Sequence, residues 1–346
     1  MRQARRSALL AALTALTATV VVLPATPAAA AGASTSPNEQ AMAINIWNTS
    51  AGFADGHAVR WSPSGQITDL GTLPGGKSSY ADGINDWGEV VGASDLQAVR
   101  WSPDGKITIL PSLTPSYGPP HSMAQAVNDA GISAGYSYVD GFHEHAVRWS
   151  PSGKLTDLGG LPGFVYSQAT AINTAGFVVG YSQDPKYVTN AVRWDPKGRI
   201  TELSSPAGYT ATEAFGINNL GYTVGTAFNP SSDTDLALEW DPAGHVHVLP
   251  TTDLIPSAPA INDRGTVVGN VQPKLTFSVP VVWHPHGSST MLPTPAPASF
   301  TYFPTAINDR GVIVGRGSEG DANLAVRWDP NGRITILAGL PGHASS

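Results

Sequence analysis

Residues 57–65 read His-Ala-Val-Arg-Trp-Ser-Pro-Ser-Gly, a short apolar segment that ends in tryptophan and leads into a proline–glycine turn. This pattern, or a close relative of it, occurs seven times, with tryptophans at Trp61, Trp101, Trp149, Trp194, Trp240, Trp283 and Trp328. The spacings are 40, 48, 45, 46, 43 and 45 residues. A period of this size is typical of repeat proteins, in which each unit buries its apolar face against its neighbours.

Each repeat contains four segments with the composition of β-strands. In the sixth repeat, Ala260–Asn262 precede an Asp-x-Gly turn and Val267–Gly269 follow it. After a loop come the tryptophan segment, its proline–glycine turn, and a fourth segment of the Ile67–Leu70 type. Short segments that are rich in Val, Ile, Thr and Trp and bounded by Gly, Pro and Asn are typical of strands. Helical periodicity is absent after residue 31, so the sequence predicts an all-β chain.

Seven units of four antiparallel strands, with about 44 residues in each, predict a seven-bladed β-propeller of four-stranded antiparallel blades over residues 41–346. The alternative is a linear β-solenoid, whose coils are usually shorter than this unit. In a meander, both tight turns of a unit lie on one face and both remaining connections lie on the other. The latter vary from Phe53–His57 to the longer Tyr136–His145. Because variable loops on a rigid scaffold often carry function, we expect the site on the long-loop face.

Alternation along the tryptophan segment predicts two different blade faces. Val and Trp should face one neighbouring blade, and Ala and Arg the other. A buried arginine needs a partner, and the turn aspartate is the obvious candidate. However, Ile46 and Thr174 replace this aspartate in units that keep the arginine, so the sequence identifies no partner.

The repeat resembles a known family. Asn-Asp-x-Gly-x-Val-Val-Gly, then His-Ala-Val-x-Trp, then Leu-Gly-x-Leu-Pro-Gly is similar to the HAF repeat of bacterial extracellular proteins, and the order of its parts looks like a kelch-type blade. His57 and His145 match the histidine of the family's motif, which the other five units lack, and Val59 and Val147 stand in place of its phenylalanine. The resemblance covers residues 41–346 and implies a secreted propeller-like protein, without assigning a reaction.

The N-terminus predicts export. Three arginines in the first six residues precede an apolar run at residues 8–23 and four alanines at 28–31. This order is typical of a secretory signal peptide, so we predict a signal at 1–31 and a flexible leader at 32–40. A membrane anchor, the alternative, needs about 18 consecutive apolar residues, and three threonines and a proline interrupt the run. No hydrophobic tail follows Leu340, so we expect free secretion without a membrane anchor.

Composition limits the partners. Removal of the signal leaves 16 basic and 26 acidic residues, and such an acidic surface disfavours nucleic acid and anionic membranes. The absence of cysteine excludes disulfides and a thiolate nucleophile. We predict a monomer with no cofactor and no metal ion.

Two sequence motifs resemble known ligand-binding motifs. Residues 71–78 match the phosphate-binding pattern GxxxxGK[ST], but this pattern functions only before a helix, and here a strand is predicted. Three His-x-His pairs begin at His143, His245 and His284. They lie in different parts of the unit and cannot all converge; only His143, with Asp140 nearby, lies in a variable loop.

The variable loops also contain aromatic residues among small polar ones. The candidate binding residues are Tyr117, His121, Tyr138, Asp140, His143, Asp184 and Tyr187. Aromatic faces beside hydroxyls and carboxylates suit a sugar ring or an extended peptide, although aromatics also simply fill loops. No catalytic motif is found, so we predict a binding module for a glycan, peptide or cell-envelope polymer. An extracellular lyase or hydrolase, with its site at the channel mouth on the long-loop face, is the alternative.

Overall fold

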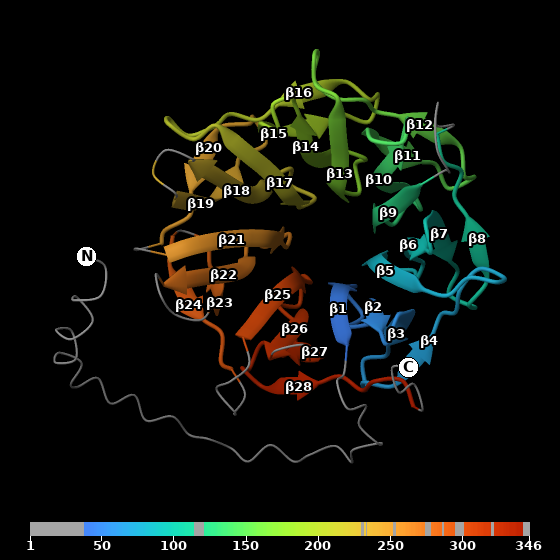
Figure 1. Cartoon of the computed structure of the whole chain (residues 1–346). Coiled ribbons are helices and arrows are strands. Elements are labelled where there is room, and N and C mark those ends of the chain that lie inside the picture. The colour runs from blue at the N-terminus through green and yellow to red at the C-terminus, as the bar shows by residue number, and fades with distance from the viewer. Residues whose placement is uncertain are drawn as a thin grey trace, which may run out of the picture. The chain divides into compact units, whose positions relative to one another are not determined.

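The computed structural model describes residues 38–113, 121–229, 232, 234–251, 254–273, 278–285, 287–294, 301–319 and 322–341. Within these ranges the chain forms seven four-stranded antiparallel sheets arranged in a ring (Figure 1). The predicted seven-bladed β-propeller is therefore confirmed. No helix long and apolar enough to cross a membrane is found among these residues.

Each blade consists of four consecutive strands. The first four blades contain β1 (Glu39–Ile44), β2 (Ser50–Ala54), β3 (His57–Trp61) and β4 (Ile67–Asp69); β5 (Ser79–Ile84), β6 (Val90–Ser94), β7 (Gln97–Trp101) and β8 (Ile107–Ile109); β9 (Ser122–Val127), β10 (Ser133–Tyr138), β11 (Glu144–Trp149) and β12 (Leu155–Asp157); β13 (Tyr166–Ile172), β14 (Val178–Gln183), β15 (Thr189–Trp194) and β16 (Ile200–Glu202). The last three contain β17 (Ala211–Ile217), β18 (Thr223–Asn229), β19 (Thr234–Trp240) and β20 (Val246–Val248); β21 (Leu254–Ile261), β22 (Val267–Pro273), β23 (Val279–Trp283) and β24 (Ser289–Met291); β25 (Thr301–Ile307), β26 (Ile313–Glu319), β27 (Ala322–Trp328) and β28 (Ile334–Ile336).

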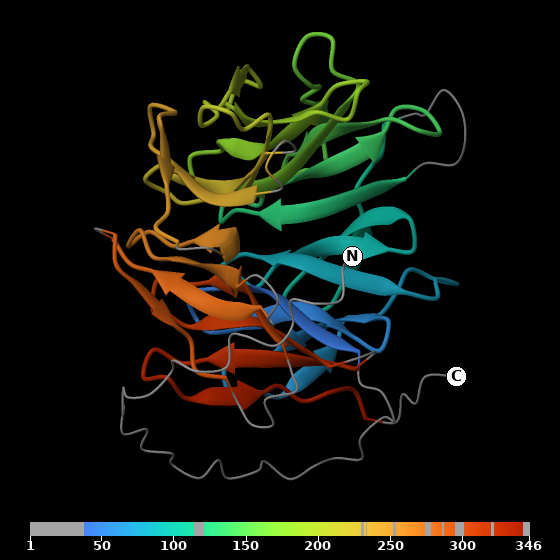
Figure 2. The ribbon, with the colours of Figure 1, turned by 60° about the vertical axis from the view of Figure 1, so that its left-hand side comes forward.

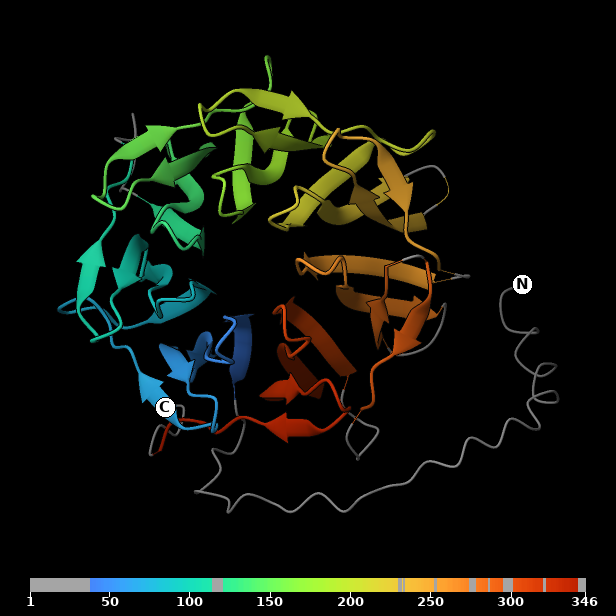
Figure 3. The ribbon, with the colours of Figure 1, turned by 180° about the vertical axis from the view of Figure 1, so that it is seen from behind.

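The first strand of each blade lies nearest the axis and the fourth lies at the outer rim (Figures 1 and 3). Strands of a blade run between the two faces of the ring (Figure 2). Antiparallel pairing places the tight turns after the first and third strands on one face, which we call the turn face. The connections after the second and fourth strands lie on the other, the loop face. This division agrees with the one expected from the sequence.

The ring closes by packing and hydrogen bonds, because every sheet uses strands of a single repeat. Strand β1 packs against β25, β26 and β27. The Trp61 indole donates to the Ala338 carbonyl at 2.7 Å, across the junction between the last and first blades. Strand β1 begins at Glu39, two residues before the predicted start of the propeller, because Glu39 already pairs with Ala54 of β2.

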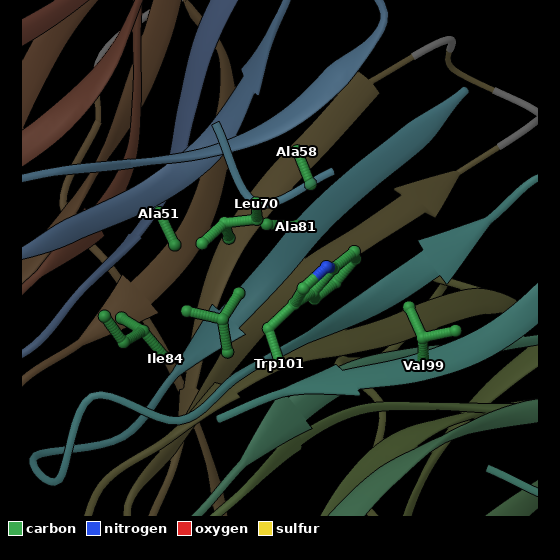
Figure 4. Packing of buried hydrophobic residues seen from close by; sticks show 8 residues of the cluster. Ala51, Ala58, Leu70, Ala81, Ile84, Val99 and Trp101 are labelled. Atoms are coloured by element: carbon green, nitrogen blue, oxygen red, sulfur yellow. The ribbon is translucent and has the colours of Figure 1, made fainter. Parts of the chain in front are cut away.

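The repeated tryptophans fill the spaces between blades. All seven are at most 1% exposed. Trp194 and Val192 of the fourth blade pack on Ala134 and Ala146 of the third, so the two predicted faces are observed. Figure 4 shows the equivalent cluster between the first two blades, around Trp101.

Six of the seven indoles also bind the segment that follows the outer strand of the preceding blade in the ring. Each donates its Nε1–H to a backbone carbonyl there: Trp61 to Ala338, Trp149 to Pro111, Trp194 to Leu158, Trp240 to Ser204, Trp283 to Pro250 and Trp328 to Pro293. The indole of Trp101 has no partner in the part of the chain that the structure describes. Each tryptophan thus combines apolar packing with a hydrogen bond, except in the second blade.

Three of the five repeated arginines, Arg60, Arg100 and Arg327, donate to backbone carbonyls of the next blade, which identifies partners that the sequence left open. Arg100 donates to the carbonyls of Gly131 and Pro151, at 2.8 and 3.1 Å, in the two tight turns of the third blade. Arg60 contacts the equivalent carbonyls of Gly88 and Pro103 in the second blade. Turn carbonyls are present in every repeat, so the arginine does not need the turn aspartate.

Each inner strand contains a bulge, and the bulge explains why the second strand has a glycine opposite it. In the fourth blade, Ala169 pairs with Gly180 and Ala171 with Val179, which leaves Thr170 as the extra residue. A Cβ on Gly180 would lie 1.9 Å from the Gln168 carbonyl oxygen, so only glycine fits. The Thr170 hydroxyl donates to the Val179 carbonyl and to the Ala214 carbonyl of the next blade, at 3.1 and 2.8 Å.

Candidate functional site

The structure brings four of the predicted site residues together on the third blade. His121 precedes β9, Tyr138 ends β10, and Asp140 and His143 lie in the loop between β10 and β11. All four are on the loop face and are partly exposed. Tyr117 lies outside the described residues.

The rings of His121 and Tyr138 form a stack. Their centroids are 4.6 Å apart with an interplanar angle of 17°, and the Tyr138 amide donates to the His121 carbonyl at 2.9 Å. Burial lowers the pKa of His121, against the charge of Glu144. At neutral pH the imidazole is therefore neutral and presents an aromatic face.

Asp140 and His143 form a hydrogen-bonded pair within their loop. The His143 Nδ1 lies 2.7 Å from the Asp140 Oδ2, and Oδ1 accepts the amides of Phe142 and His143. These contacts, with the His143 side chain as the largest, lower the pKa of Asp140 to about 2. The His143 ring lies 5.0 Å from the Tyr166 ring of the next blade. His145, two residues on, instead pairs with Asp157 at 3.0 Å, as His57 does with Asp69.

Sequence reasoning missed the polar residues that join these rings across two blades. The Gln168 Nε2 of β13 donates to the Glu144 Oε1 of β11 at 2.6 Å. Tyr138 also hydrogen-bonds Glu144, and burial followed by the charge of Glu144 raises the pKa of Tyr136 to about 12. We call His121, Tyr136, Tyr138, His143, Glu144, Tyr166 and Gln168 the loop-face cluster.

One sequence signal could have found part of this cluster. The residue after the repeated glycine of each second strand varies: it is Phe53, Ala93, Tyr136, Tyr181, Thr226, Asn270 and Arg316. Tyr136 and Tyr181 are adjacent in this series, and burial with the charge of Glu213 raises the pKa of Tyr181. Variation inside an otherwise regular strand indicates a surface free to specialise.

Asp184 and Tyr187 do not join the cluster. They form their own turn between β14 and β15, in which the Tyr187 amide donates to the Asp184 carbonyl and Asp184 Oδ1 accepts the amides of Lys186 and Val188. Tyr187 is 73% exposed at a φ of 68°. Among the described residues, no hydrogen bond or ring contact links this turn to the loop-face cluster.

A second site, which sequence reasoning did not find, lies on the axis at the turn face. It is a cavity of about 200 Å³ that lies where the first strand of each blade ends, at the turn face. The repeated asparagines surround it in a closed belt, in which each side-chain Nδ2 donates to the backbone carbonyl of the next blade's asparagine at 2.9–3.2 Å. The members, in order, are Asn45, Asn85, Asn128, Asn173, Asn218, Asn262 and Asn308, which returns to Asn45.

The next residue of each repeat forms a second, interrupted belt. The Ile46 amide donates to Asp86 Oδ1 and the Asp86 amide to Asp129 Oδ1, both at 2.9 Å. An equivalent arc runs from Thr174 through Asn219 and Asp263 to Asp309. Burial, with the nearby charges of Asp129 and Asp309, raises the pKa of Asp86. Four carboxylates therefore surround the cavity, and their crowding disfavours full ionisation.

No group of three or more metal-ligating side chains in metal geometry occurs within the described ranges. The phosphate-pattern segment, residues 71–78, leads directly into β5 rather than into a helix, so it does not form a phosphate loop.

Comparison with known proteins identifies the fold and no closer relationship. No family model and no curated protein match the chain. A puromycin hydrolase structure is similar with a TM-score of 0.63 at 14% identity, over 89% of this chain and 54% of that one. A streptogramin B lyase gives 0.55 at 11% identity over 88% and 94% of the two chains. A virginiamycin B lyase from Staphylococcus aureus gives 0.52 at 15% identity over 77% and 86%. The chain spans about half the length of the hydrolase.

Proposed function

We propose that this chain is a secreted binding module and that its loop-face cluster holds a glycan. The observation that carries the proposal is the 2.6 Å contact between Glu144 and Gln168, which places a carboxylate and an amide from two blades beside aromatic rings. The resemblance of the repeat to the HAF repeat and the N-terminal signal pattern support export.

The chemistry of the cluster matches a sugar better than a peptide. A pyranose has an apolar C–H face, which packs on rings such as the His121–Tyr138 stack and Tyr166. Its hydroxyls both donate and accept, as the carboxylate of Glu144 and the amide of Gln168 require. An extended peptide instead binds by pairing with an exposed sheet edge, and the inner strand here is joined to the next blade by bonds such as that of Thr170.

Retention on immobilised polysaccharides and cell-wall material tests this proposal. We expect Tyr138→Ala and Glu144→Gln each to weaken binding about tenfold, since each removes one contact worth about 1–1.5 kcal/mol. Tyr187→Ala is the matched control, because Tyr187 is an exposed loop aromatic outside the cluster, and it should bind as the parent does. Failure of every polysaccharide to retain the protein, or equal loss in the control, contradicts the proposal.

A lyase or hydrolase is the second candidate, favoured by the pKa values of Glu213 and Tyr136, both of which burial raises. A carboxyl group with a raised pKa keeps its proton to a higher pH than a free carboxyl group does, and this suits general acid catalysis. The names of the similar lyases and hydrolase agree with this reading at the level of fold only. If it is correct, the polysaccharide that binds is cleaved, and Glu213→Gln abolishes cleavage while retention persists. Intact polysaccharide after prolonged incubation rules out the enzyme.

A further inference from the structure

Two tryptophans of the turn face lie outside the buried clusters between the blades. Trp47 and Trp87 occupy the third position of the first-strand turn in the first two blades and are 58% and 71% exposed. Other repeats have Ala130, Ala175, Leu220, Arg264 and Arg310 at this position. The turn therefore does not require an aromatic residue, whereas the seven packing tryptophans are all buried.

Trp87 is held in place although it is exposed. Its Nε1–H donates to the Asp129 carbonyl of the next blade at 3.0 Å, and its amide donates to Asn85 Oδ1 at 3.1 Å. The edge of the indole is fixed while most of its surface stays in water. An aromatic platform that is already ordered binds a ligand without a further cost in side-chain entropy.

Trp87 follows Asp86 in the chain and hydrogen-bonds Asp129, and both aspartates are wall residues of the axial cavity. Oδ1 of each accepts an amide of the preceding blade, and the described structure shows no partner for either Oδ2. The only basic residues at the same turn position are Arg264 and Arg310, on the sixth and seventh blades. Arg310 lies over the Trp47 ring, 5.4 Å from its centroid. The second and third blades thus combine two carboxylates with the exposed indole of Trp87, and neither blade has a basic residue at the third position of the first-strand turn.

The geometry points to a second binding site at the turn-face mouth of the channel, for a ligand with a protonated amine on an apolar skeleton. The ammonium group binds between Asp86 and Asp129, and the skeleton lies on Trp87. Arg310 on Trp47 shows that a cation on the neighbouring indole fits this rim. The cavity is smaller than the roughly 300 Å³ at which drug-sized pockets begin, so it takes the head group and leaves the rest of the ligand outside.

Titration with n-pentylamine, followed by tryptophan fluorescence and calorimetry, tests this site. We expect saturable binding of pentylamine and none of 1-pentanol, which has the same skeleton without the charge. Comparison of glucosamine with n-pentylamine distinguishes an amino sugar from a simple alkylamine as the preferred source of the amine, and N-acetylglucosamine is the uncharged control for glucosamine. Raising the salt concentration should weaken binding of either amine.

Variants separate this site from folding and from the loop face. Trp87→Ala and Asp129→Asn should each weaken pentylamine binding at least tenfold, whereas Leu220→Ala, the same turn position in the fifth blade and 62% exposed, should not. Trp87 is exposed, so its removal leaves the fold intact, which circular dichroism will verify. Polysaccharide retention should be unchanged in Trp87→Ala. Three results would each overturn the inference: no amine binding up to about 50 mM, a concentration at which even a weak fragment binds; equal binding of pentanol; or full binding of pentylamine by Trp87→Ala.

Discussion

Trp194→Ala should lower the free energy of unfolding by about 4 kcal/mol, within the range for truncation of a buried tryptophan. The side chain is fully buried against Ala134, Ala146 and Ala169, and small side chains cannot expand into the space that it would leave. Its hydrogen bond to the Leu158 carbonyl is lost as well. Urea unfolding followed by far-ultraviolet circular dichroism measures the change.

Trp→Phe variants at two repeats separate packing from hydrogen bonding. Trp194→Phe removes the donor to Leu158, whereas Trp101→Phe removes an indole N–H that has no partner in the described structure. We expect the loss at Trp194 to exceed the loss at Trp101 by about 1 kcal/mol, the usual net value of such a bond. Equal losses would show that the indole hydrogen bonds do not stabilise the blade junctions.

The sequence predicted the fold because the signals that determine it repeat. Trp61 and its six equivalents give the number of blades, and alternation along their strands gives the two faces of each blade. The arginine partners could not be predicted, because Arg100 binds the carbonyls of Gly131 and Pro151. Backbone carbonyls belong to every residue, so no residue type in the sequence marks them.

The candidate site was predicted only where it is local in sequence. The residues that the sequence identified correctly lie within one blade and its loops: His121, Tyr138, Asp140 and His143. Glu144 and Gln168 come from two different blades. Their contact could be predicted only with knowledge of how adjacent blades pack, which the sequence pattern does not supply. The axial cavity was missed for a different reason. Its asparagines are the same in every repeat, and the search for a site was directed at the loops that vary between repeats.

Two buried acids occupy positions where other repeats have hydroxyl groups. Glu39 is 6% exposed and hydrogen-bonds the Ala325 amide, where Ser79 and Ser167 accept the equivalent amides and donate to the carbonyls of Gly71 and Gly159. Asp82 is the bulge residue of β5, equivalent to Thr170, whose hydroxyl donates to two carbonyls. The Asp82 Oδ2 is buried with no partner among the described residues. A hydroxyl can donate at both positions, whereas a carboxyl group can do so only when protonated.

Stability should therefore fall as the pH rises from about 4 to about 7. Burial raises the pKa of Asp82 to about 7, and burial with the Asp55 charge raises that of Glu39 to about 7. The folded state then holds protons that the unfolded state releases, so stability is highest below the unfolded pKa values and reaches its lower limit above the folded ones. With about 1.4 kcal/mol for each pKa unit, the rises from 4.5 to about 7 at Glu39 and from 3.8 to about 7 at Asp82 together correspond to a loss of about 8 kcal/mol.

The double variant Glu39→Ser and Asp82→Thr should remove most of this loss. Both new hydroxyls can make the bonds seen at Ser79 and Thr170 without a change of protonation. Urea midpoints at pH 5, 6, 7 and 8 should descend steeply for the parent and less steeply for the variant, with the two curves closest at about pH 5. A smaller slope remains in the variant because burial also raises the pKa values of Glu213 and Asp86. The carboxyl group of Asp140, whose pKa is lowered to about 2, titrates below this window and does not contribute. Parallel curves for parent and variant would show that Glu39 and Asp82 are ionised in the folded blades and that their positions tolerate buried charge.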